Sequence, residues 1–167
     1  MVVSVHTVTK ADIPWVTEQF TKDWGADFVV SRGVKHYPKD LQGFYAADEK
    51  GNRVGLVTYE VVGNDCEMVT LNAFTPRSGI GTALVASLRK LAKGHGCHRV
   101  WLVTTNDNVD ALRFYQRRGF QLVSVFPQAI DESRKIKPTI PLEGFYGIPI
   151  RDEIVLEMNI IKPDEQR

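Results

Sequence analysis

The chain is poor in cysteine and has no long apolar run. Only two cysteines, Cys66 and Cys97, occur in 167 residues, and their spacing excludes a C-x-x-C metal or redox motif. Both fall in segments that we expect to be core strands, so we predict reduced, buried thiols of an intracellular protein without a disulfide. No stretch of about 18 uncharged apolar residues occurs, and residues 1–9 do not resemble a signal peptide. We therefore expect a soluble cytoplasmic protein with no membrane partner.

The chain also lacks a charge imbalance. The chain has twenty-one Lys and Arg residues and twenty Asp and Glu residues, which leaves a formal net charge of +1. No overall field attracts a polyanion, so we predict no nucleic-acid partner. The four histidines show no metal-ligand spacing, and we predict no metal. A length of 167 residues, 43% of them hydrophobic, suits one globular domain over residues 1–167.

Hydrophobic periodicity predicts alternating strands and helices in two parts of the chain. The first part is expected to contain a strand, a helix and three antiparallel strands, at residues 2–9, 10–22, 42–47, 54–62 and 66–74. The second part is expected to contain helix, strand, helix, strand and a last strand, at residues 82–93, 98–105, 108–118, 120–126 and 152–160. Segment 23–41 has no readable pattern, and 127–150 is predicted to be a long ordered loop. This order predicts an α/β fold with a partly parallel sheet.

The segment T-P-R-S-G-I-G-T at residues 75–82 joins a predicted strand to a predicted helix. Unpaired N–H groups and the positive end of the helix dipole meet there, which is an arrangement that binds phosphate. Gly79 and Gly81 let a pyrophosphate approach the backbone. The dinucleotide fingerprint fails because Leu84 stands at the third glycine position, and a P-loop fails because no Lys precedes Thr82. A nucleotide binder other than a CoA binder is thereby disfavoured.

A second motif, N-V-D-A-L-R-F-Y-Q-R-R-G-F at residues 108–120, follows the next strand. Together the two motifs resemble the GNAT superfamily of acetyl-CoA-dependent N-acetyltransferases, over residues 66–120. That family has an Arg/Gln-x-x-Gly-x-Gly/Ala loop and a later Asn-x-x-Ala-x-x-(apolar)-Tyr-x-x-x-Gly-Phe helix. The resemblance implies an antiparallel N-terminal part and a splayed parallel pair in a mixed sheet of about seven strands, flanked by about four helices. It also implies acetyl-CoA as co-substrate.

The resemblance implies which residues hold acetyl-CoA. They are Val69, Leu71, Asn72, Ala73, Arg77, Ser78, Gly79, Ile80, Gly81, Thr82, Ala83, Asn108, Ala111, Phe114 and Tyr115. One position departs from the family, because Pro76 stands where Arg or Gln is usual. We hypothesise that Arg77 supplies the missing contact to the pyrophosphate, with Arg113 and Arg117 as alternatives.

Acetylation of an amine needs a base, an oxyanion donor and an acid for the departing thiolate. The resemblance implies the backbone N–H of Leu71 as oxyanion donor and Tyr115 as acid. Strand alternation predicts Asp65 and Glu67 on one face with Val69 and Leu71. An amine with a pKa of about 10.4 is protonated at neutral pH, so a carboxylate must accept its proton. We favour Glu67 as base, with Asp65 as the alternative.

The acceptor pocket is expected in segments 24–37 and 129–150, since family members bind acceptors between early helices and a late loop. Charges of both signs mix there, so the acceptor is left as an amine of a small molecule or a protein. Residues 133–138 are interpreted as a solvated loop. Competing interpretations are a catalytically silent acyl-CoA sensor and a transferase of another acyl group. A homodimer is common in the family, but no apolar stripe predicts one.

Overall fold

The computed structural model describes residues 1–161, whose strands form one large sheet and one small sheet. The large sheet is mixed and has seven strands in the order β1-β4-β5-β6-β7-β9-β8, and the small sheet pairs β2 with β3. The strands are Ser4–Thr7 (β1), Val29–Ser31 (β2), Val34–His36 (β3), Gln42–Ala47 (β4), Arg53–Val62 (β5), Asp65–Ala73 (β6), Arg99–Thr105 (β7), Gln121–Phe126 (β8) and Glu153–Asn159 (β9). The predicted mixed α/β fold is confirmed.

Four α-helices and three short 3-10 helices complete the elements among these residues. The α-helices are Ile13–Trp24 (α1), Ile80–Gly94 (α2), Val109–Arg117 (α3) and Ala129–Ile136 (α4), and the 3-10 helices are Lys10–Asp12 (η1), Pro38–Asp40 (η2) and Phe145–Gly147 (η3). No helix within the described residues is long and apolar enough to cross a membrane. The chain divides into two compact units, one made of Met1–Ile13, Lys39–Val100 and the segment from Asn159, the other of Pro14–Pro38 and Trp101–Met158. The one-domain assignment stays a prediction.

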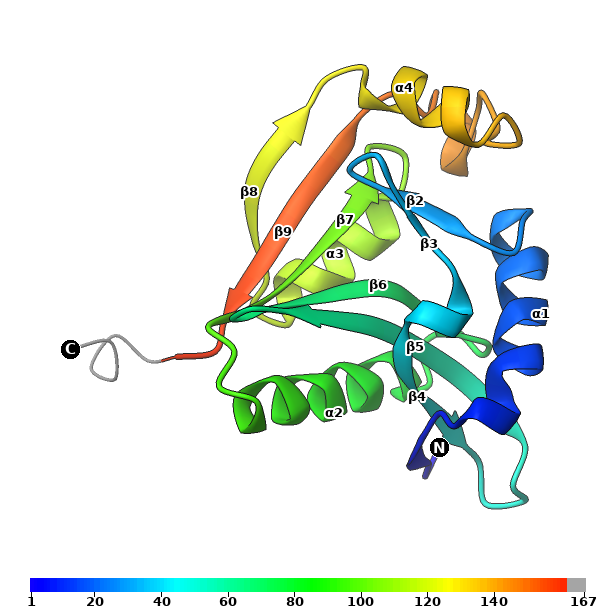
Figure 1. Ribbon diagram of the computed structural model, residues 1–167, viewed down its shortest axis with the longest axis vertical. Coiled ribbons are helices and arrows are strands. Elements are labelled where there is room, and N and C mark those ends of the chain that lie inside the picture. Colours follow the sequence, from blue (N-terminus) through cyan, green and yellow to red (C-terminus); the bar gives the residue numbers. More distant parts are fainter. Residues whose placement is uncertain (162–167) are drawn as a thin grey trace. The chain divides into compact units, whose positions relative to one another are not determined.

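The first unit is an antiparallel sheet covered by α2. Strands β1, β4, β5 and β6 pair in turn, and α2 packs along β4, β5 and β6 (Figure 1). The helix buries a stripe at helical spacing, formed by Ile80, Leu84, Val85, Leu88 and Ala92. A Cβ added at Gly55 would lie 2.5 Å from Ile80 Cγ2 and 3.1 Å from Leu84 Cδ1. The glycine therefore allows the helix to approach β5 closely.

A β-bulge interrupts the pairing of β5 with β6. Thr58 pairs with Thr70 and Tyr59 with Met68, which leaves Val69 as an extra residue in β6. One extra residue reverses the alternation of side chains beyond it. The hydroxyls of Thr58 and Thr70, 2.6 Å apart, place these two side chains on one face.

The bulge corrects one prediction about the faces of β6. Glu67 pairs with Glu60, which shares a face with Thr58, whereas Leu71 pairs with Val57 on the face that α2 covers. The prediction that Glu67 and Leu71 lie on one face is therefore wrong. A bulge depends on the register of the partner strand, and the alternation of β6 alone does not contain it.

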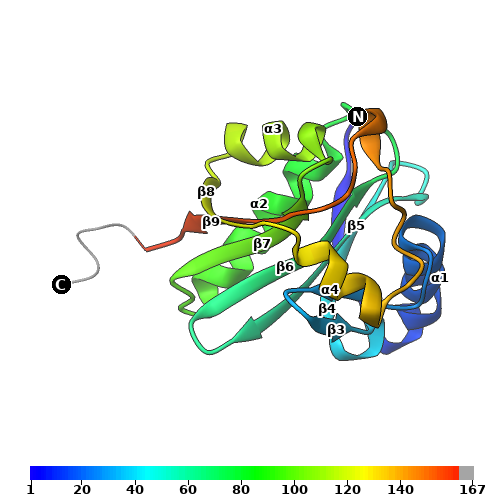
Figure 2. The same cartoon turned by 90° about the horizontal axis from the view of Figure 1, so that it is seen from above.

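The second unit contains a short hairpin in a segment that had no readable pattern. Strands β2 and β3 are joined at Arg32 and Gly33, whose φ angles are 49° and 77°. Two consecutive positive φ angles are typical of the tight turns that connect hairpins. Helix α4 contacts β2, and α3 contacts β8. Strand β8 pairs antiparallel with β9 (Figure 2).

The long loop predicted over residues 127–150 contains α4, so that prediction and the solvated loop at 133–138 are wrong. Ile130 and Ser133 are buried one turn apart, and Lys137 directly after the helix is buried as well. Only eight residues form the helix, which is short for a periodicity signal. The order of its charges does indicate a helix, because acidic residues stand in the first turn and basic residues in the last.

Both cysteines are buried and free, as predicted. Burial raises the pKa of Cys66 to about 12, so its thiolate is scarce at neutral pH. The chain's own thiols therefore react slowly with reagents that detect free CoA.

Gly55→Ala is expected to lower the free energy of unfolding by about 1–3 kcal/mol, because its Cβ overlaps Ile80 and lies 2.9 Å from the Asn72 carbonyl oxygen. Gly94→Ala is the matched control, since nothing lies within 4 Å of its Cβ and alanine favours a helix by up to about 1 kcal/mol. Urea unfolding of the two variants measures the difference. Equal stability of both would show that α2 does not need the glycine.

Candidate functional site

The loop between β6 and α2 holds its shape through the backbone. Gly79 is the N-cap of α2 with φ 81° and ψ −1°, and Arg77 has φ 56°. The Ser78 hydroxyl donates to the Thr75 carbonyl at 2.6 Å. Nothing lies within 4 Å of a Cβ built on Gly79, so the left-handed backbone, rather than crowding, requires glycine there.

The N-terminus of α2 presents donors and no acid. Its first hydrogen bond runs from the Ala83 N–H to the Gly79 carbonyl at 3.0 Å. The N–H groups of Ile80 and Gly81 come before it and have no carbonyl partner within the helix. The first turn has no acidic residue, and the N-cap makes no side-chain hydrogen bond. A 15-residue helix with this start offers an anion both N–H donors and the positive end of its dipole.

Arg77 is the basic side chain of this loop. It is exposed, and within residues 1–161 it has no hydrogen bond or ion pair. The alternative Arg113 forms an ion pair with Asp110 at 3.6 Å, and Arg117 is exposed on α3. Of the three candidates, Arg77 is the one that lies in the turn predicted to bind phosphate.

The backbone of β6 directs two N–H groups away from β5. The Phe74 N–H donates to the Val54 carbonyl at 2.9 Å, which fixes the phase of the antiparallel ladder. Because N–H groups alternate between the two edges of a strand, those of Leu71 and Ala73 point away from β5. The candidate oxyanion donor thus lies on the edge that β5 does not use.

Two carboxylates lie opposite each other on the face away from α2. Glu67 is 8% exposed, and one of its carboxylate oxygens lies within 4.8 Å of a carboxylate oxygen of Glu60. Asp65, the alternative base, forms an ion pair with Arg99 at 3.1 Å. Asp65 is thus committed to a guanidinium, whereas Glu67 faces a second carboxylate across the strand pair. The geometry favours Glu67.

In the second unit, α3 carries the other predicted residues. Asn108 is its N-cap and donates from Nδ2 to Thr104 Oγ1 at 3.3 Å. Tyr115 is half-buried and makes edge contacts with Phe114 and Phe120 at ring distances of 5.4 and 5.5 Å. Burial raises the pKa of the Tyr115 phenol above its ordinary range. Gly119, with φ 96°, ends the helix in a conformation that suits glycine.

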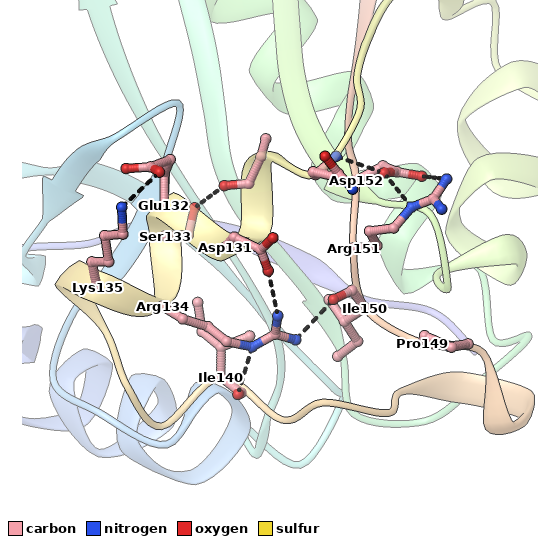
Figure 3. Close-up of polar contacts among 12 residues, drawn as sticks. Asp131, Glu132, Ser133, Arg134, Lys135, Ile140, Pro149, Ile150, Arg151 and Asp152 are labelled. Atoms are coloured by element: carbon pink, nitrogen blue, oxygen red, sulfur yellow. Dashed lines mark hydrogen bonds and ion pairs between the residues drawn. The ribbon is translucent and has the colours of Figure 1, made fainter.

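The two segments predicted to bind the acceptor are in contact within the second unit. Lys137 Nζ donates to the Phe28 carbonyl at 3.0 Å, and α4 contacts β2. The side chain of Arg134 then organises the chain after α4. It donates to the carbonyl groups of Ile140 and Ile150 and forms an ion pair with Asp131 at 3.5 Å (Figure 3). It also donates to the Pro141 carbonyl at 2.7 Å.

Two further polar residues, which follow β7, hold the same loop. The Asn106 side chain donates to the Pro149 carbonyl and accepts from the N–H groups of Arg151 and Asp152, all at 2.9 Å. Asp107, 2% exposed, accepts from the Phe145 N–H at 3.1 Å. Sequence reasoning missed Asn106, Asp107 and Arg134, although a polar run directly after a strand is a signal for such a role.

Comparison with protein families matches residues 13–120 to the acetyltransferase (GNAT) family. The chain is 43% identical over 141 residues to the uncharacterized protein YdhI of Bacillus subtilis, covering 84% of this chain and 88% of that protein. It is 38% identical over 142 residues to the uncharacterized protein YxbD of the same organism, covering 84% and 89%.

Solved structures agree on the fold. An IAA acetyltransferase from Bacillus cereus has a TM-score of 0.75 at 23% identity and covers 95% of this chain and 99% of its own. A GNAT acetyltransferase from Elizabethkingia anophelis with acetyl-CoA bound has a TM-score of 0.68 at 17% identity, covering 94% and 97%. The family match, which covers more than half of the chain, shows that the chain belongs to the acetyltransferase (GNAT) family.

Proposed function

We propose that the protein transfers the acetyl group of acetyl-CoA to a primary amine, by direct attack of the amine in a ternary complex. The observation that carries the proposal is that three features follow one another along the chain in one unit. They are a bulged strand, a left-handed backbone at Gly79 and a helix whose first turn has no acidic residue. These features supply donors for a pyrophosphate and for a thioester carbonyl. Family membership supports the same activity.

Acetyl-CoA, when bound, supplies the activated thioester. The residues of the loop fit its pyrophosphate because the N–H groups of Ile80 and Gly81 and the side chain of Arg77 face no competing carboxylate in the first turn. We assign the Leu71 N–H, which points away from β5, as the donor to the carbonyl oxygen when negative charge develops on it. Such a donor stabilises the transition state more than the ground state.

Glu67 is proposed to accept the proton of the incoming ammonium group. Two carboxylates directly opposite each other on neighbouring strands repel, and a cation beside them relieves that repulsion. We assign this role to Glu67 because it is the more buried of the two carboxylates, and the negative charge of both favours a protonated amine nearby.

Tyr115 is proposed to protonate the departing thiolate. A raised pKa keeps the phenol protonated at every pH near neutrality, which an acid requires. A residue that only fills space between Phe114 and Phe120 would not need a hydroxyl. A silent acyl-CoA sensor would keep the loop and dispense with Glu67 and Tyr115, so the turnover of their variants separates the two functions.

Calorimetric titration is expected to show binding of acetyl-CoA and CoA but not of ATP, since the loop lacks both nucleotide fingerprints. Arg77→Ala should raise the dissociation constant of acetyl-CoA about tenfold, because a charge-assisted hydrogen bond is lost. Arg89→Ala, an exposed residue further along α2, is the control and should leave binding unchanged. An unchanged constant for Arg77→Ala would assign the pyrophosphate contact to Arg113 or Arg117.

Glu67→Gln is expected to lower kcat about 100-fold and to remove the acid limb of the pH profile, because the base is lost. Asp65→Asn is the control, since Asp65 is already paired with Arg99. Thiol release against a panel of primary amines measures both. A Glu67→Gln enzyme with the wild-type rate and pH profile would exclude this base.

Tyr115→Phe is expected to lower kcat about 100-fold while acetyl-CoA binding persists. The wild-type enzyme should lose no activity from Tyr115 ionisation up to pH about 10, because burial moves the phenol pKa upward from the ordinary value of about 10. Thiol release measured between pH 7 and pH 10 tests whether the pKa of Tyr115 is raised. Undiminished turnover of the variant would remove Tyr115 from the mechanism.

A further inference from the structure

Lys137 is a buried cation without a carboxylate partner. It is 5% exposed, donates once to the Phe28 carbonyl at 3.0 Å, and its Nζ lies 5.5 Å from the centroid of the Phe28 ring. Within residues 1–161 it makes no ion pair. Burial lowers the pKa of its ammonium group, and no nearby carboxylate opposes that effect. A buried cation without a counter-ion costs stability.

The neighbouring charges are already committed to other groups. Arg134 is occupied by three carbonyl groups and Asp131, and Lys135 pairs with Glu132 at 2.8 Å. The acids of α4 are thus neutralised within the helix. Lys35, in the hairpin, has its Nζ 5.0 Å from the same Phe28 ring and likewise makes no ion pair among the described residues. Positive charge accumulates around one aromatic ring.

A structural role explains only part of this arrangement. Lys137 follows the C-terminus of α4, where a cation complements the helix dipole, and the Phe28 carbonyl gains a donor. An ammonium group has three donors, and a single one satisfies that carbonyl. A neutral amide would satisfy it without the cost of a buried charge. The remaining donors and the charge suit an oxyanion.

We propose that Lys137, with Lys35, binds a carboxylate or phosphate group carried by the acceptor amine, whose apolar part rests against Phe28. The acceptor is then an acidic amine, such as an amino acid or a phosphorylated amine. This inference rests on the proposed function, because it assigns the bound oxyanion to the acceptor. Phe28 and Lys137 belong to the two segments expected to hold that acceptor.

Calorimetry with matched ligands tests the site without catalysis. Phenylalanine is compared with phenethylamine, and O-phosphoethanolamine with ethanolamine, so that each pair differs in one acidic group. The wild-type protein is expected to bind at least one acidic ligand about tenfold or more tightly than its partner. The pair that shows the difference tells carboxylate from phosphate. Inorganic phosphate alone reports whether a free anion suffices.

Lys137→Gln removes the charge and keeps a donor for the Phe28 carbonyl, and it should abolish the preference for the acidic ligand. Lys137→Arg should retain it in part. Lys135→Met, an exposed neighbour paired with Glu132, is the control and should retain it fully. Thermal unfolding of each variant confirms that it is folded, and an acidic ligand should raise the Tm of the wild type but not that of Lys137→Gln.

Turnover then separates this inference from the proposed function. With an acidic acceptor, Lys137→Gln should raise KM about tenfold or more and change kcat little. Acetyl-CoA that does not bind would overturn the proposed function. Acetyl-CoA that binds, with amines that bind or react without preference for the acidic member, would overturn only the oxyanion site. A preference that survives in Lys137→Gln would overturn it equally.

Discussion

The extra residue Val69 in β6 decides how the first unit presents its functional groups. Without the bulge, Glu67 and Leu71 would share a face, because strand side chains alternate with a period of two. With it, Glu67 pairs with Glu60 on the face away from α2, whereas Leu71 packs on the α2 side. The Leu71 N–H still points away from β5. One irregularity in the ladder thus separates the position of the proposed base from that of the proposed oxyanion donor.

The second unit is organised by polar side chains that bind backbone groups. Arg134, Asn106 and Asp107 hold the chain between α4 and β9 through carbonyl and N–H groups. Such a loop is preorganised, so a ligand that meets it loses less free energy to ordering. Because these residues are saturated, they are poor candidates for ligand contacts. The charge of Lys137, which has no counter-ion within residues 1–161, differs from them in that respect.

The acid and the base of the proposed reaction are set by opposite surroundings. Tyr115 lies among aromatic rings whose low polarity keeps its phenol neutral. Glu67 lies opposite a second carboxylate, which favours a cation at that place. Asp65, two residues away, is held by Arg99 and is withdrawn from the same role. Environment, rather than residue type, distinguishes these carboxylates.

Local sequence signals determined the strands and helices with clear periodicity, the Gly-x-Gly turn before α2 and the family. The positions of Gly79 and Gly119 were readable because glycine adopts a left-handed backbone at no steric cost and both stand at a predicted helix end. Tertiary structure alone decided the bulge at Val69, because register depends on the partner strand. It also decided the surroundings of Lys137, whose Nζ meets the carbonyl of a residue 109 positions away. Contacts between such distant residues leave no periodic trace in either segment, so the folded chain, not the sequence pattern, specifies them.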